Sequence, residues 1–201
     1  LLKNPHYWQP DKQKSEGVRM LAFAGNDGAN LAAANGDVDW APQFIPNIEQ
    51  AYVAKDPEHR FFWFPTTGSM ISWQFNTTKA PFDNPDVRKA LSMAVDRDQV
   101  TSIGMPGYPI PADCTGLSGA YDAWRDSDVV DSCTWTKRDL DAAGELLDAA
   151  GITRGADGTR VLPDGSPFGF DFSGGWTSSD GGSGGNGVSQ NLPELGVTVT
   201  G

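Results

Sequence analysis

The stretch from Phe75 to Val100, FNTTKAPFDNPDVRKALSMAVDRDQV, predicts the end of a strand, a turn and a capped amphipathic helix. Pro81 and Pro85 exclude an earlier helix, because proline has no amide proton to donate. Asn84 is the expected N-cap, since Pro85 then takes the first helical position, where proline is tolerated. The apolar residues that follow share one helical face: Val87, Leu91, Ala94 and Val95.

Strand signals occur on both sides of this helix. The runs expected to form strands, from their aromatic, β-branched or alternating residues, are 18–24, 38–40, 60–64, 70–75, 160–162 and 167–173. The segment 104–135 is rich in Pro, Gly and Asp and is expected to be a long surface loop.

Two further helices are expected from their apolar spacing and their ends. The first covers 26–35, with Leu31 and the alanines facing inward and Gly36 just past its end. The second is expected to be capped by Thr136 and ended by Gly151. Its apolar stripe consists of Leu140, Ala143, Leu146, Leu147 and Ala150.

The stretch 181–187, GGSGGNG, is typical of a flexible linker. Inside a helix, each glycine would cost about 1 kcal/mol relative to alanine. Gly182, Gly184 and Gly187 match the pattern G-x-G-x-x-G, but a dinucleotide site needs this pattern between a strand and a helix. The surrounding glycines make a chance match the better interpretation, so we expect a linker and no cofactor.

Composition excludes several classes of partner. The chain of 201 residues has a net charge of −11, whereas nucleic acid and anionic membranes attract clustered Lys and Arg. No run approaches the roughly 20 apolar residues that span a bilayer. The length is sufficient for a real hydrophobic core. We therefore expect a globular protein that does not bind nucleic acid.

The reactive side chains do not form a catalytic or metal-binding pattern. His6 and His59 are far apart, and neither has a Ser or Cys at a catalytic spacing. The two cysteines have no nearby histidine and fall short of the four ligands of a structural zinc site. With 26 acidic residues, spacing alone cannot single out the carboxylate pair of a glycosidase. We expect no metal and no catalysis.

Several motifs together resemble the family 5 extracellular solute-binding proteins. These proteins are the oligopeptide-, dipeptide-, nickel- and oligosaccharide-binding components of ABC importers. The segment 76–97 is similar to the signature region of that family, N-T-T-K-x-P-F-D-x-P-x-V-R-K-A-L-S-M-A-V-D-R. Further segments resemble family motifs in the same order: L-x-N-P-x-Y-W at 2–8, x-G-E-I-D at 35–39, A-x-x-L-L-x-E-A-G at 139–151, L-P-D-G at 162–165 and x-x-L-x-x-L-G-I-x-V at 191–199.

The resemblance implies a partial α/β fold of the type II periplasmic-binding-protein kind. Residues 1–65 would belong to the first lobe and hinge region, and residues 66–201 to the second lobe. Family members are exported and are longer than this chain, so we expect a piece of a longer protein. The resemblance also implies a membrane permease as partner and a location in the periplasm or on a cell-surface lipoprotein.

The two cysteines, Cys114 and Cys133, flank a polar, acidic segment. They could be two free, partly buried thiols or a disulfide that closes a surface loop. Export, which the resemblance implies, favours the disulfide. A loop of this size would stabilise the fold by roughly 3 kcal/mol in the chain-entropy model.

The seven tryptophans are the best indication of a ligand. Most are expected to pack in the core, yet a tryptophan ring also stacks well on the apolar face of a pyranose. Trp40, Trp73 and Trp176 are the candidates for a binding cleft, because they lie at strand ends or in a loop. Three polar residues are candidates for hydrogen bonds to hydroxyl groups: Gln43, Asn76 and Asp180.

Two segments are similar to the oligosaccharide-binding branch of the family. They are DWAPQFIPNIE at 39–49 and PADCTGLS at 111–118. We therefore expect capture of an oligosaccharide, of the cello- or manno- type, without chemistry. An oligopeptide is the alternative ligand, and a carbohydrate-active enzyme is a more distant alternative.

Overall fold

The computed structural model describes residues 1–64, 70–104, 107–173 and 179–200. The chain divides into two compact units, 1–43 and 44–201, which are taken in turn. The predicted boundary between the two lobes, at residue 65, differs from this division and stays a prediction.

The first unit contains a single turn of 3-10 helix, η1 (Pro10–Lys12), and the helix α1 (Asn26–Asn35). Helix α1 ends as predicted at Gly36, whose φ of 82° is a left-handed conformation that favours glycine. The amide of Gly36 donates to the carbonyls of Ala32 and Ala33, and both alanines are buried. Leu31 was predicted to face inward but is 62% exposed, because adjacent helical residues lie about 100° apart around the axis.

The second unit consists of helices around two small sheets. The helices are α2 (Ile48–Ala51), η2 (Val53–Lys55), α3 (Pro85–Ala94), α4 (Arg97–Gly104), η3 (Gly119–Trp124), α5 (Ser127–Ser132), η4 (Thr134–Thr136), α6 (Leu140–Ala149), α7 (Ser179–Asn191) and η5 (Leu192–Leu195). The strands are β1 (Thr153–Arg154), β2 (Arg160–Val161), β3 (Gly169–Asp171) and β4 (Thr198–Thr200). Strands β1 and β2 pair antiparallel, whereas β3 and β4 pair parallel, with Phe170 opposite Val199.

Helix α3 begins as the sequence predicts. The side chain of Asn84 accepts a hydrogen bond of 2.9 Å from the amide of Asp86, and Pro85 is the first helical residue. Val95 then has an extended backbone, so a second helix, α4, starts at Arg97. The buried side chain of Asn191 stabilises this break, because its Oδ1 accepts from the amide of Asp96 at 2.8 Å.

Helix α6 also forms where it was predicted, but its cap is different. Asp139 is the N-cap, and its carboxylate accepts from the amide of Ala142 at 3.0 Å. Thr136, the predicted cap, lies in η4, where its hydroxyl donates to the carbonyl of Cys133. Helix α6 packs against α3, and a hydrophobic core cluster includes residues of both helices: Val87, Ala90, Leu91, Met93, Ala94, Ala143, Leu147, Ile152, Phe168, Leu192, Leu195 and Val197.

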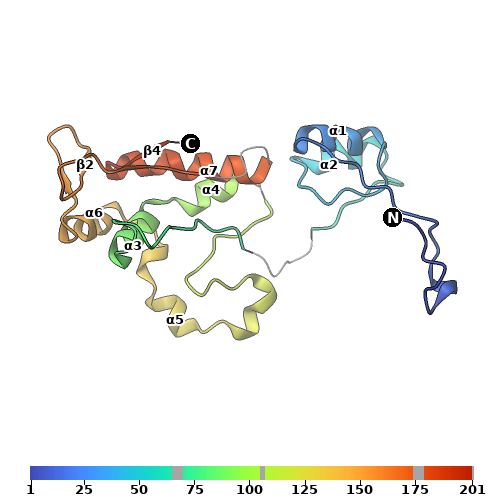
Figure 1. Ribbon diagram of the computed structural model, residues 1–201, viewed down its shortest axis with the longest axis horizontal. Helices are drawn as coiled ribbons and strands as arrows, with labels where there is room; N and C mark the ends of the chain where they lie inside the picture. The colour runs from blue at the N-terminus through green and yellow to red at the C-terminus, as the bar shows by residue number, and fades with distance from the viewer. Residues whose placement is uncertain (65–69, 105–106, 174–178, 201) are drawn as a thin grey trace. The chain divides into compact units, whose positions relative to one another are not determined.

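The prediction of a flexible linker over 181–187 is wrong, because these residues lie within helix α7. Helix α7 runs beside α4, and it connects β3 to β4 in a parallel βαβ arrangement (Figure 1). A Cβ atom placed on Gly187 would lie 3.1 Å from Cγ2 of Val100. Glycine at 187 therefore permits a close approach of the two helices, which offsets part of its poor helix propensity.

Four segments that were predicted as strands do not belong to a strand in the described part of the chain: 18–24, 38–40, 60–64 and 70–75. Alternation favours an extended backbone, but a ladder also needs a neighbouring strand for its hydrogen bonds. The alternation itself is preserved in the last segment, where Trp73 and Phe75 are half-buried and Gln74 is exposed. The predicted strands at 160–162 and 167–173 do form, as β2 and β3.

Candidate ligand-binding surfaces

The predicted ligand-binding residues are distributed over both units. Trp40 and Gln43 lie in the first unit, whereas Trp73 and Asn76 lie in the second. Trp176 lies outside the described residues. Asp180 belongs to the first turn of α7, and its side chain is also outside them. Each pair is therefore described on its own.

Trp40 lies in the loop after α1 and has the geometry of a stacking residue. Its side chain is 80% exposed. Gln43, three residues further on, is half-buried, and its Nε2 donates to Oδ1 of Asn30 on α1 at 3.3 Å. This hydrogen bond attaches the loop to the helix and leaves the indole of Trp40 accessible to a ligand.

Trp73 has a packing role in addition to any contact with a ligand. Its ring centroid lies 4.5 Å from that of Phe75 and 5.6 Å from those of Phe170 and Phe172. This cluster covers the side of strand β3 and continues into the core through Phe82. Clusters of this kind contribute packing energy, so the exposed part of Trp73 is smaller than the sequence suggested.

Asn76 stabilises the turn that precedes α3. Its Oδ1 accepts from the amide of Thr78 at 3.1 Å and from the hydroxyl of Thr78 at 2.7 Å. Asn76 is exposed, and this turn keeps its side chain at a defined place near the aromatic cluster of Trp73 and Phe75.

The expectation that most tryptophans pack in the core is wrong for the described residues. Four of the six tryptophans in this part of the chain are at least 78% exposed: Trp8, Trp40, Trp63 and Trp124. Trp63 and Phe61 share one side of the segment 60–64, where they are 82% and 83% exposed. The period of two in an extended segment could have identified this pair from the sequence.

The segment 107–135, part of the predicted long surface loop, contains the short helices η3, α5 and most of η4 and has its own internal connections. Cys114 and Cys133 form a disulfide with a Cα–Cα distance of 6.2 Å. The guanidinium of Arg125 lies 3.1 Å from the carboxylate of Asp113 and donates to the carbonyl of Leu117 at 2.6 Å. Hydrogen bonds from Thr115, together with the positive charge of Arg125, lower the pKa of Asp113 below its usual value. The loop thus presents exposed Trp124 from a connected scaffold.

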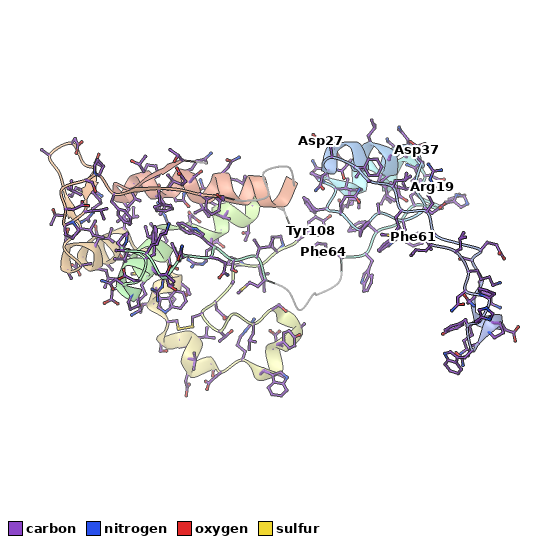
Figure 2. All side chains as sticks on the ribbon, in the orientation of Figure 1. Arg19, Asp27, Asp37, Phe61, Phe64 and Tyr108 are labelled. Carbon is purple, nitrogen blue, oxygen red and sulfur yellow. A yellow bond between two sulfur atoms is a disulfide. The ribbon has the colours of Figure 1, made fainter. Side chains whose placement is uncertain are left out.

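Tyr108 lies at the start of this loop and contacts the segment 44–64. Its ring centroid is 5.5 Å from that of Phe44, 6.2 Å from that of Phe62 and 4.8 Å from that of Phe64. Figure 2 shows the side chains of Phe64 and Tyr108 next to each other. Desolvation, followed by the negative charge of Glu49 and a hydrogen bond to it, raises the pKa of Tyr108.

An open groove of about 630 Å³ lies beside the disulfide, between α3, η4 and α6. Its charged lining residues are Lys89 and Glu145, and Lys89 pairs with Asp86 of its own helix at 3.0 Å. The rest of the lining consists of the polar residues Ser132 and Thr134 together with Cys133 and the apolar Met93, Trp135, Ala142 and Leu146.

The described residues contain neither a cluster that could hold a metal ion nor a helix that could cross a membrane. In that part of the chain, His, Cys, Asp and Glu do not gather in threes or more at a place that could hold a metal ion. The described helices are also too short or too polar for any of them to cross a membrane.

Comparison with known proteins assigns the chain to a family. The model of the bacterial extracellular solute-binding proteins, family 5 (middle part), matches residues 1–200. The oligopeptide-binding protein OppA of Bacillus subtilis is 26% identical over 112 residues, which are 56% of this chain and 21% of that protein. The glutathione-binding protein GsiB of Escherichia coli is 29% identical over 106 residues, which are 53% of this chain and 20% of that protein.

A solved structure shows the same fold. It is the periplasmic oligopeptide-binding protein of an ABC transporter from Thermotoga maritima, with mannohexaose bound. The TM-score is 0.75 at 23% identity, over 99% of this chain and 38% of that one. The predicted α/β fold of the type II periplasmic-binding-protein kind, present in part, is thereby confirmed. The matched parts make up only about a fifth of the length of these curated relatives. The family model matches residues 1–200, and the chain belongs to the family 5 bacterial extracellular solute-binding proteins.

Proposed function

We propose that this chain is part of the substrate-binding component of an ABC importer, which captures an oligosaccharide of the cello- or manno- type and releases it unchanged. The family match over residues 1–200 is the observation that carries the binding role. Under this proposal the protein acts outside the cytoplasm, in the periplasm or as a cell-surface lipoprotein, and delivers its ligand to a membrane permease. It performs no chemistry on the ligand.

Exposed aromatic rings support a sugar as the ligand. Trp40 is 80% exposed in a loop that Gln43 attaches to α1. Indole rings in such positions stack on the C–H faces of pyranoses, and nearby amide groups bond to hydroxyls. We propose that Trp40 and Trp176 stack on the sugar, with Trp73 at the edge of the site. Gln43, Asn76 and Asp180 would then orient its hydroxyl groups.

The lobe assignment belongs to the same proposal. Residues 1–65 would contribute to the first lobe and residues 66–201 to the second. Receptors of this kind close on the ligand by a hinge movement. Closure would desolvate the stacked rings and increase affinity.

An oligopeptide is the second candidate ligand. The related OppA is named as an oligopeptide-binding protein and the related GsiB as a glutathione-binding protein. The solved structure with mannohexaose is also named as an oligopeptide-binding protein, so both ligand classes occur on this scaffold. Peptide binding would rely on backbone pairing and charged groups rather than on exposed indoles.

Calorimetry of the full-length receptor tests the choice of ligand. We expect heat with cello- or manno-oligosaccharides, and none with a peptide mixture or glutathione. Replacing Trp40 with alanine is expected to weaken sugar binding about tenfold, which corresponds to about 1.4 kcal/mol. Trp8→Ala is the matched control, because Trp8 is equally exposed in the same unit but lies outside the proposed site.

The same titrations can overturn the proposal. Heat with peptides alone would replace the sugar by an oligopeptide. An equal loss of affinity in the Trp8 and Trp40 variants would remove Trp40 from the site. Turnover of a chromogenic glycoside would contradict the non-catalytic role.

A further inference from the structure

The aromatic cluster around Tyr108 joins two parts of the chain that are distant in sequence. Its ring contacts three phenylalanines of the segment 44–64, and the shortest centroid distance, 4.8 Å, is to Phe64. The contacts to Phe44 and Phe62 are edge-on, at interplanar angles of 78°. Edge-to-face pairs at these distances are favourable beyond the area that they bury.

The segment 60–64 presents its two faces differently. Phe62 and Phe64, which contact Tyr108, are 37% and 47% exposed. Phe61 and Trp63, on the alternate positions, are 83% and 82% exposed. An extended backbone places successive side chains on opposite faces, so one face of this segment packs on Tyr108 and the other remains accessible.

Glu49 of α2 acts on the hydroxyl group of Tyr108, because desolvation and then the negative charge of Glu49 raise the pKa of that hydroxyl. The ring therefore contacts phenylalanines of the segment 44–64, while a carboxylate of the same segment acts on its polar end. Tyrosine suits a contact that excludes water only in part, because its ring is apolar and its hydroxyl group is polar.

We propose that Tyr108 is an aromatic latch that attaches segment 44–64 to the disulfide-closed loop and limits the relative movement of the two lobes. This inference rests on the proposed function, because the lobe boundary at residue 65 places Tyr108 and its phenylalanine partners on opposite sides. Hinge movements are absorbed by a few connecting residues. Loss of the ring contacts increases the number of open conformations, and closure on the ligand then costs more free energy.

Distances between spin labels in the full-length receptor test the latch. The labels are attached to cysteines introduced at Glu58, in the segment 44–64, and Asp141, on α6, both of which are exposed. Without ligand, we expect Tyr108→Ala to broaden the distance distribution relative to the unsubstituted receptor. Tyr108→Phe keeps the ring and is expected to retain the narrow distribution. Ligand affinity is expected to fall about tenfold in Tyr108→Ala, the effect of losing aromatic contacts of this size.

Matched variants separate the latch from general stability. Tyr121→Ala removes an exposed tyrosine from η3 and is expected to change neither distance nor affinity. If Tyr108→Ala does not fold, Phe64→Leu is used in its place. Leucine keeps apolar volume but loses the ring contact with Tyr108, so this variant is expected to broaden the distance distribution. If the folded variant has the same distance distribution as the unsubstituted receptor, the latch proposal is overturned. Absence of sugar binding in the unsubstituted receptor would contradict the proposed function instead, while the ligand-free distances still decide on the latch.

Discussion

Replacing Arg160 with methionine is expected to lower the free energy of unfolding by about 3–5 kcal/mol, because breaking a buried charged network leaves its partners unsatisfied. Arg160 is 3% exposed, in strand β2. Its guanidinium donates to the carbonyl of Ile152 at 2.8 Å, and to those of Gly144 and Leu195 at 3.3 and 3.4 Å. It also pairs with the carboxylate of Asp148.

The three carbonyls decide the size of this effect. They belong to α6, the residue before β1, and η5, so a single side chain connects three elements. Asp148 is 57% exposed and would return to water at little cost, whereas the carbonyls would lose their donor. Gly144 shows how closely the guanidinium fits, since a Cβ atom there would lie 2.9 Å from its Nη2.

Arg138→Met is the matched control for Arg160→Met. Arg138 pairs with Glu194 at 2.8 Å, but the two side chains are 35% and 52% exposed, and such pairs contribute about 0–1 kcal/mol. Urea unfolding followed by circular dichroism would measure both variants. Equal effects of the two substitutions would show that the Arg160 network does not stabilise the fold.

Removing the disulfide with Cys114→Ser and Cys133→Ser is expected to cost about 3 kcal/mol, since it restores the chain entropy of a closed loop to the unfolded state. The two cysteines are separated by 19 residues. The ion pair between Arg125, inside this loop, and Asp113, just before it, remains in the variant. We therefore expect the loop to keep its native contacts at low urea and the midpoint of unfolding to fall.

Reductant provides the matched comparison for this prediction. Treating the unsubstituted protein with a thiol reductant is expected to lower its midpoint by the same amount and to leave the double variant unchanged. Mass spectrometry of the secreted protein with and without reductant would show the bond directly. Two free thiols in the secreted protein would contradict the disulfide.

Local signals predicted helices α1, α3 and α6 better than they predicted the strands. Asn84 and Pro85 define the start of α3, and Gly36 defines the end of α1, because capping depends on a few neighbouring residues. The segments 18–24 and 70–75 have the composition of strands, yet they do not belong to a strand in the described part of the chain. Strand pairing depends on a partner that the local sequence does not contain.

The Gly-rich stretch 181–187 was misjudged for a related reason. Propensity argues against a helix, but the contact of α7 with α4 and the connection between β3 and β4 require one there. Tertiary packing routinely overrides propensity in this way. Thr136 and Asp139 are both good caps three residues apart, and only the packing of α6 selects Asp139.

The candidate site was predictable in part. Exposure of Trp40 agrees with a stacking role, whereas the ring contacts of Trp73 show that a strand-end tryptophan can also belong to a packed cluster. The contacts of Tyr108 could not be predicted, because they join residues more than 40 positions apart through the fold alone. The chemical type of a residue is read from the sequence, whereas the fold decides whether its side chain is buried or exposed and which residues it contacts.

Native mass spectrometry of the full-length receptor with a cello- or manno-oligosaccharide tests the central claim most directly. We expect a complex whose mass is that of the receptor plus one intact sugar, and an unchanged sugar after release. Shortened sugars would reveal an enzyme, and a complex that forms only with peptides would contradict the proposed capture of an oligosaccharide.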